Sequence, residues 1–123
     1  MTELELKTKQ VGLQSLKEQE REIHRKIKDI EAEIDQHHLD KAKEQFAGLN
    51  VGDKIVVTEK GWDGSLHEYE PAFFYDVRYS RYSFHNPDCI ELVLHKAKKD
   101  GSMSKLEVTV YVRRVVKVEK VAE

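Results

Sequence analysis

The feature of this sequence that most constrains its fold is a repeat of leucine and isoleucine in the first third of the chain. Between residues 13 and 37 the repeat advances by alternating steps of three and four, which is the spacing of the a and d positions of a coiled coil. Six of the eight positions are apolar, and the other two are a glutamate and a histidine. In chain order the positions are Leu13, Leu16, Glu20, Ile23, Ile27, Ile30, Ile34 and His37.

This apolar stripe is narrow, because the positions beside it are polar or charged. A narrow stripe favours pairing with another helix over burial on a broad globular core. Lys26 at a g position would face Glu31 at an e position of a parallel partner, which is an attractive pairing. A parallel and an antiparallel pair both remain open at this point.

Capping signals bound the predicted helix. Thr2 with Glu5 and Ser15 with Glu18 both have capping-box spacing, so the helix can start at either place, and Gly48 is a suitable C-terminal stop. A helix from Ser15 to that glycine would be about 50 Å long. A compact domain made of the remaining residues would be about 30 Å across. The helix therefore cannot lie wholly on that domain.

Part of the stripe must then contact another chain or another helix. We expect a homodimer formed through this helix. The alternatives are a helix that folds back at Gly12 and a stripe half covered by the second half of the chain. The residues expected to form the dimer are Leu16, Ile23, Ile27, Ile30 and Ile34.

The composition changes near Gly48 and divides the chain into two predicted parts. Both prolines, five of the six glycines (Gly48 included), the only tryptophan and all five tyrosines lie at or after this point. A helical half followed by a β half is the simplest interpretation. We therefore predict an α+β fold, with an N-terminal coiled-coil helix over residues 1–48 and a small β-barrel binding domain over residues 49–123.

Five strands are expected in the second half, separated by turn residues. A long loop follows the first strand, Asn86-Pro87-Asp88 forms a turn, and Asp100-Gly101 marks a hairpin. Five antiparallel strands close most easily as a small barrel, because closure removes exposed edges. The expected strands lie at residues 54–60, 71–84, 89–95, 106–111 and 115–121.

Alternation predicts which side chains point inward, since successive residues of a strand face opposite sides. Each of the three central strands carries a run of apolar residues at every second position. The residues expected inside are Phe73, Tyr75, Val77, Tyr79, Ile90, Leu92, Leu94, Leu106, Val108 and Val110.

The segment Leu49-Asn-Val-Gly-Asp-Lys-Ile-Val-Val57 resembles the first strand of SH3-like, Tudor-like and KOW-like small barrels. The resemblance extends over residues 49–121. It implies that Trp62 to Pro71 form the long first loop and that Asp100-Gly101 form the distal hairpin. It also implies that Arg113-Arg114 lie at the short turn before the last strand.

Charge and cysteine content exclude several classes of protein. The net charge is −2, which excludes a generally basic nucleic-acid coat. The single Cys89 excludes an internal disulfide framework and fits a reducing cytosol, so we expect a cytoplasmic protein. No apolar run approaches the roughly 20 residues of a membrane span, and the N-terminal residues lack the pattern of a signal peptide.

No catalytic motif is evident, so we expect a protein that is not an enzyme and that has no cofactor and no metal. A zinc ion would need about four converging ligands, and a nucleophilic cysteine would need a histidine partner. Four residues, His85, Asp88, Cys89 and His95, lie close enough in sequence to raise both alternatives. The competing interpretation is that Cys89 is a small apolar residue at the start of a strand.

The expected function is binding of a protein partner through aromatic residues on one face of the barrel. Large aromatic side chains are enriched at the energetic centres of protein interfaces. Such a chain would act as a dimeric adaptor or as a small inhibitor of the kind that bacteriophages and mobile elements encode. The residues expected to contact the partner are Trp62, Tyr69, Tyr82 and Phe84.

The alternative function is nucleic-acid binding, because small barrels hold single strands by aromatic stacking combined with cations. The sequence supplies basic residues near the predicted strand ends, although the β half is neutral overall. The residues expected to bind nucleic acid are Arg78, Arg81, Arg113 and Arg114.

Overall fold

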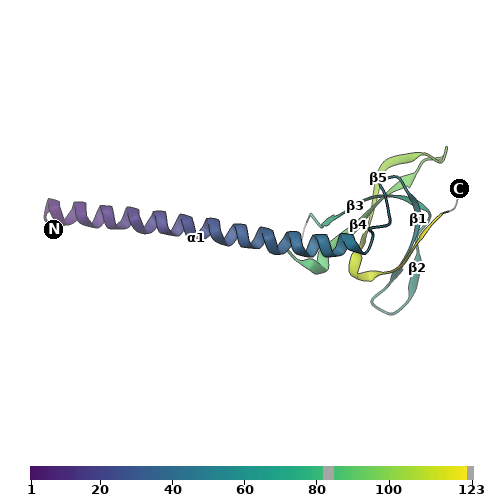
Figure 1. Ribbon diagram of the computed structural model, residues 1–123, viewed down its shortest axis with the longest axis horizontal. Coiled ribbons are helices and arrows are strands. Elements are labelled where there is room, and N and C mark those ends of the chain that lie inside the picture. The colour runs from purple at the N-terminus through teal and green to yellow at the C-terminus, as the bar shows by residue number, and fades with distance from the viewer. Residues whose placement is uncertain (82–84, 122–123) are drawn as a thin grey trace. The chain divides into compact units, whose positions relative to one another are not determined.

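A computed structural model gives the structure of the chain and describes residues 1–81 and 85–121. One long helix is followed by a curled antiparallel sheet (Figure 1), so the α+β prediction is confirmed. The chain divides into two compact units, Met1–Asp35 and Gln36–Glu123. The second unit therefore includes the last turns of the helix as well as the sheet.

Helix α1 spans Glu3–Glu44 without a break at Gly12. It starts at the earlier of the two predicted caps: the Glu5 backbone N–H donates to the Thr2 hydroxyl over 3.2 Å, which satisfies one of the free N–H groups of the first turn. Acidic residues in the first turn and lysines in the last turn complement the helix dipole. Among the described residues, no helix combines the length and apolarity needed to cross a membrane.

The sheet has six strands within the described residues, one more than expected. The additional strand, β2, lies inside the segment predicted as a long loop. The strands are β1 (Lys54–Lys60), β2 (Leu66–Glu68), β3 (Ala72–Tyr79), β4 (Ile90–Ala97), β5 (Met103–Tyr111) and β6 (Val115–Lys120). Two short 3-10 helices lie between strands, at Pro87–Cys89 and at Val112–Arg114.

All the strand pairs are antiparallel, and β1 has the most partners. It pairs with β6 along one edge, and with β2 and the start of β3 along the other. Strand β3 then pairs with β4, and β4 pairs with β5. The chain enters β1 through Gly52-Asp53, where the Gly52 N–H donates to the Phe74 carbonyl and the Phe74 N–H donates to the Asp53 carbonyl.

The hydrophobic core of the second unit combines one face of the sheet with the end of α1. Ala42 lies in the last turn of the helix, and Phe46 follows in the turn after it, so the helix end closes the core that the strands leave open. The core residues are Ala42, Phe46, Ile55, Val57, Ala72, Phe74, Val77, Ile90, Leu92, Leu94 and Val112.

Strand β3 differs from the expected alternation because it contains a bulge. Its pairing with β4 skips Tyr75, so the residues before and after that point face the core with opposite parity. Phe74 is buried instead of Phe73, whereas Tyr75 is 39% exposed. Beyond the bulge, Val77 is buried and Tyr79 packs against the core as expected. The inward assignments of Phe73 and Tyr75 were therefore wrong.

Strand β5 also departs from the expected pattern at one residue. Val110 is buried and Val108 packs against the core, but Leu106 is 67% exposed. The register between β4 and β5 shifts between His95 and Ala97. Leu106 lies opposite this irregular stretch, beyond the last core residue of β4, so its side chain is left at the surface.

A matched pair of leucine substitutions tests this core. Leu92 is 0% exposed, so Leu92→Ala should lower the free energy of unfolding by about 2–5 kcal/mol. The same substitution at the exposed Leu106 should change it by less than about 0.5 kcal/mol. Chemical denaturation followed by near-ultraviolet circular dichroism would measure both. Equal effects of the two substitutions would contradict the burial described for β5.

Candidate functional site

The side chain that stands out at the surface of the sheet unit is Trp62, which is 93% exposed. It lies in the tight turn that joins β1 to β2. The Gly61 N–H donates to the Ser65 carbonyl over 2.8 Å, and the Ser65 hydroxyl donates to an Asp63 oxygen over 2.7 Å. Gly64 adopts a φ of 87°, which glycine reaches without strain. Hydrogen bonds on both sides of the indole thus define the backbone that carries it.

The hairpin between β4 and β5 is closed by the same Asp-Gly-Ser sequence with the same hydrogen bonds. The Lys98 N–H donates to the Ser102 carbonyl over 2.7 Å, and the Ser102 hydroxyl donates to Asp100 over 2.6 Å. Lys99 holds the place in this turn that Trp62 holds in the first. The two turns are therefore structural equivalents that present different side chains.

The aspartate of each turn is held in its ionised form. The Ser65 hydroxyl, and then the Ser65 N–H, donate hydrogen bonds that lower the pKa of Asp63 below its usual range. The Ser102 hydroxyl and N–H lower the pKa of Asp100 in the same way. At neutral pH both carboxylates are therefore in the charged form that accepts these hydrogen bonds.

A cavity of about 630 Å³ lies at the other end of β2, where the sheet curls open. This volume is in the range of small-ligand pockets. Charged and apolar groups both face it, including two glutamates, a lysine and core leucine and valine side chains. The lining residues are His67, Glu68, Tyr69, Glu70, Pro71, Ala72, Leu94, Lys96, Ala97 and Val108.

Tyr69 lines this cavity but is anchored to the sheet. Its hydroxyl donates to Glu59 over 3.0 Å, its ring packs against the core, and His67 meets it edge-on at 4.6 Å. Burial, and then the hydrogen bond to Glu59, raise the pKa of Tyr69. Tyr69 therefore lies at the base of the β1–β2 hairpin and Trp62 at its tip, and a common contact surface for the two stays a prediction.

Two of the four aromatic residues predicted to contact a partner, Tyr82 and Phe84, lie outside the described residues. Their place in such a surface stays a prediction.

The arginines predicted to bind nucleic acid lie near one set of residues that face each other across β3, β4 and β5. Arg78 on β3 is opposite Glu91 on β4, and Glu91 is opposite Tyr111 on β5. With strands about 4.8 Å apart, the Cα atoms of Arg78 and Tyr111 are about 10 Å apart. The Arg78 guanidinium forms an ion pair with Glu107. Acidic groups are therefore interleaved with the basic ones on this face.

Arg113 and Arg114 both lie against the Tyr111 ring, with guanidinium carbons 5.5 and 5.6 Å from its centroid. They belong to the 3-10 helix between β5 and β6, which agrees with the predicted short turn. Arg81 is exposed just beyond the end of β3. Cations and an aromatic ring thus meet at Tyr111, a residue that the sequence did not single out.

A second cluster missed by the sequence lies on the outer face of β3, β4 and β5. The Tyr75 ring stacks on His95 with centroids 4.1 Å apart. His95 Nδ1 lies 2.8 Å from the Ser104 carbonyl oxygen, which can only accept, so the proton is on Nδ1. His95 Nε2 faces Glu107 at 4.0 Å. The bulge at Tyr75 creates this stack, and no sequence signal marks the bulge.

The residues considered for metal binding do not form a metal site in the part of the chain that is described, and the nucleophilic alternative stays a prediction. No group of three or more His, Cys, Asp or Glu side chains there could hold a metal ion. Cys89 is half-buried at the end of a 3-10 helix, where its N–H donates to Asn86 and its carbonyl accepts from Ser80. These backbone hydrogen bonds join the 3-10 helix to the residue that follows β3.

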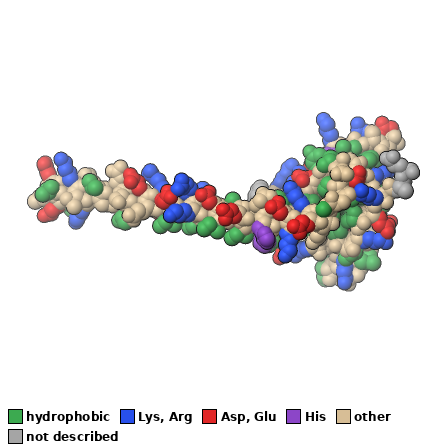
Figure 2. All heavy atoms as spheres, in the orientation of Figure 1, with side chains coloured by type: hydrophobic (Ala, Val, Ile, Leu, Met, Phe, Trp, Pro, Cys, Tyr) green, Lys and Arg blue, Asp and Glu red, His purple; other side chains and the backbone are tan. Residues whose placement is uncertain are grey.

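In the first unit, the predicted dimer residues form an exposed apolar stripe on α1. Their side chains are between 46% and 63% exposed. Figure 2 shows apolar side chains gathered along one edge of the helix. The predicted dimer residues with these exposed fractions are Leu16, Ile23, Ile27, Ile30 and Ile34.

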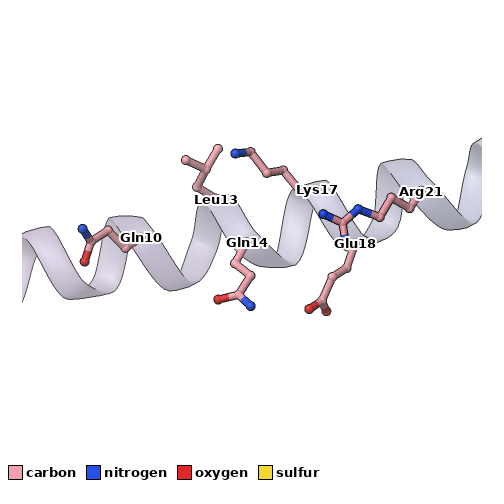
Figure 3. A pocket seen from close by; sticks show the side chains of 6 residues that line it. All are labelled: Gln10, Leu13, Gln14, Lys17, Glu18 and Arg21. Atoms are coloured by element: carbon pink, nitrogen blue, oxygen red, sulfur yellow. The ribbon is translucent and has the colours of Figure 1, made fainter.

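Nearer the N-terminus the helix surface has a shallow depression lined by side chains that all come from α1 (Figure 3). A single helix cannot enclose a ligand, so this depression is an ordinary gap between exposed side chains. Its lining residues are Gln10, Leu13, Gln14, Lys17, Glu18 and Arg21.

The hydrogen bonds of the Trp62 turn can be tested by titration. Ser65→Ala removes the hydroxyl hydrogen bond, which is the largest cause of the lowered Asp63 pKa, so that pKa should rise toward its ordinary value while the pKa of Asp100 stays unchanged. Ser102→Ala should have the opposite pattern. Because both carboxyl groups have lowered pKa values, the turns should loosen only as the pH falls through those values, below about pH 4. Carboxyl chemical shifts from NMR would check both results. An Asp63 pKa that is unchanged in Ser65→Ala would refute the hydrogen bond from the Ser65 hydroxyl to Asp63.

Comparison with models of protein families, with curated proteins and with solved structures finds no match to this chain. A functional conclusion must therefore rest on the geometry of the chain itself. Three features carry that geometry: the exposed tryptophan turn, the exposed stripe of α1 and the arginines around Tyr111.

Proposed function

We propose that this chain is a non-enzymatic, self-associating interaction protein that binds a protein partner through the Trp62 turn. It would act as an adaptor or a small inhibitor. The observation that carries the proposal is the 93% exposure of Trp62 on a turn closed by hydrogen bonds. The single free cysteine fits a reducing compartment, so we place the protein in the cytoplasm.

An exposed indole on a defined turn has the properties of an interface anchor. Tryptophan is among the residues that contribute most binding energy at protein interfaces, where it fills a pocket of the partner. A turn already held by its own hydrogen bonds loses little conformational freedom on binding. The equivalent turn of the β4–β5 hairpin carries Lys99, so this turn type does not itself require a tryptophan.

We further infer that the curled sheet is an SH3-like barrel. The supporting features are the strand order β6-β1-β3-β4-β5 and the 3-10 helix between β5 and β6. The segment that carries Trp62 then corresponds to the long first loop of such barrels. In this interpretation the hairpin of β1 and β2 is an ordered version of that loop.

Self-association through α1 is supported by the exposure of its stripe. Side chains at the d position Leu16 and at the a and d positions from Ile23 to Ile34 are about half exposed, and they follow heptad spacing. Removing such side chains from water in a helix pair is favourable by roughly 25 cal/mol for each Å² of apolar surface. A second copy of the chain supplies the same stripe and therefore the matching surface.

Nucleic-acid binding is the alternative function, and one observation favours it. Arg113 and Arg114 gather at the Tyr111 ring, which combines two cations with a surface on which a base can stack. Glu91 lies opposite Tyr111, and Glu107, further along the same strand as Tyr111, pairs with Arg78, so acidic groups weaken this potential. We therefore place protein binding first.

The test of the Trp62 proposal is affinity capture by the full chain, with matched variants at the two equivalent turns. Capture from a cell lysate, with and without nuclease, should yield a protein partner that survives nuclease. Lys99→Ala should capture it as the parent chain does, whereas Trp62→Ala should lose at least about tenfold in affinity, or 1.4 kcal/mol. With the purified partner, the fluorescence of the only tryptophan should shift as the indole leaves water.

Capture that is equal for the parent chain and Trp62→Ala would reject Trp62 as the contact. Bound material that disappears with nuclease, and that is lost on changing Arg113 and Arg114, would favour the alternative function.

Self-association is tested by a second matched pair on the helix. Ile27→Glu places a charge in the apolar stripe, whereas Ala32→Glu places the same charge at an f position away from it. Burying an unpaired carboxylate is costly, so Ile27→Glu should weaken self-association at least tenfold and Ala32→Glu should leave it nearly unchanged. Analytical ultracentrifugation would measure both, and a parent chain that stays monomeric at millimolar concentration would refute the proposal.

A further inference from the structure

The inference concerns the orientation of the helix pair and rests on the proposed self-association. We propose that two copies of α1 pack antiparallel, in the register that places Ile27 opposite Ile30 of the partner subunit. The partner is a second copy of this chain, and the surface is the exposed stripe from Glu20 to His37.

The two polar positions of the stripe decide the orientation. Glu20 and His37 lie at equal distances on either side of the midpoint between Ile27 and Ile30. In the proposed register each Glu20 therefore faces His37 of the partner subunit, at both ends of the interface. A carboxylate and an imidazole form a hydrogen bond or an ion pair, so neither group is buried without a partner.

The apolar positions pair with one another in the same register. Four exposed isoleucines lie between the two polar positions, and each of them meets an isoleucine of the other copy. Ile23 faces Ile34 of the partner subunit, and Ile27 faces Ile30 of the partner subunit. The interface is thus a continuous run of isoleucine pairs closed at each end by a polar pair.

The flanking charges agree with this arrangement. An antiparallel pair brings g positions together along one side and e positions together along the other. Lys26 then faces Glu33 of the partner subunit, and His24 faces Glu31 of the partner subunit. Both flanking pairs join unlike groups. Within one chain, His24 Nε2 also lies 3.5 Å from Glu20.

A parallel pair of helices would bury the same stripe with less favourable contacts between its polar positions. It places Glu20 against Glu20 of the partner subunit, which brings two carboxylates together in the seam. Isoleucine at d is also unfavourable in parallel dimers and shifts the preference toward trimers. A parallel trimer would gather three copies of Glu20 in one layer. The attraction between Lys26 and Glu31 remains in a parallel pair, but it lies outside the seam.

Antiparallel registers shifted by one heptad are also less favourable. A shift in one direction places Glu20 against Ile30 of the partner subunit, and a shift in the other places His37 against Ile27 of the partner subunit. Each leaves Glu20 or His37 facing an isoleucine without a polar partner, which is costly. The proposed register avoids this and places Leu16 opposite Lys41 of the partner subunit, whose aliphatic stem can cover it. Only the proposed register pairs both polar positions with each other.

Disulfide cross-linking of the full chain tests the orientation. Ile23→Cys and Ile34→Cys are made separately in a Cys89→Ser background, with C-terminal tags of different size. In the proposed register, a mixture of the two variants forms a mixed disulfide. Ile23→Cys alone should not link to itself, because its two copies would lie about 16 Å apart along the helix axis. A disulfide requires Cα atoms within about 7 Å.

The parent chain is measured in parallel by light scattering, which separates the two proposals. A mass of twice 14.4 kDa with a mixed disulfide supports both self-association and the antiparallel register. A mass of twice 14.4 kDa with an Ile23→Cys chain that links to itself overturns the register and leaves self-association intact. A trimer mass overturns the antiparallel pair, and a monomer mass overturns both proposals.

Discussion

The hydrogen bonding of β1 is the interaction on which the sheet depends. This strand pairs with β6 along one edge and with β2 and β3 along the other. It thus joins the last strand of the chain to the first hairpin, and it holds the base of the turn that presents Trp62. Its inward residues, Ile55 and Val57, are fully buried, so the same strand organises the pairing and the core.

The two units of the chain bury apolar surface in different ways. The sheet unit closes its own core and recruits Ala42 and Phe46 at the end of α1 to do so. The first unit has no such core, since every residue before Asp35 is exposed. An apolar stripe at heptad spacing on an otherwise charged helix is energetically incomplete in a single chain. This difference is the physical basis for separating self-association from partner binding.

The two Asp-Gly-Ser turns show how one local structure can serve two purposes. Both use a serine to fix the aspartate and the aspartate to fix the backbone. One presents Trp62 and the other presents Lys99, and the backbone geometry does not depend on which. The backbone of the turn therefore does not require a tryptophan at this position. This makes a functional role the simplest reason for the exposed indole.

The helix, the strand positions, the turns and the heptad were predictable from the sequence, because each depends on neighbours a few residues away. The extra strand β2, the parity of β3 and the exposure of Leu106 depended on tertiary structure. A bulge at Tyr75 reverses which side chains face the core, and it exists only in relation to the register with β4. The local sequence shows which side chains of a strand alternate between two faces. The pairing of that strand with distant strands decides which of the two faces is buried.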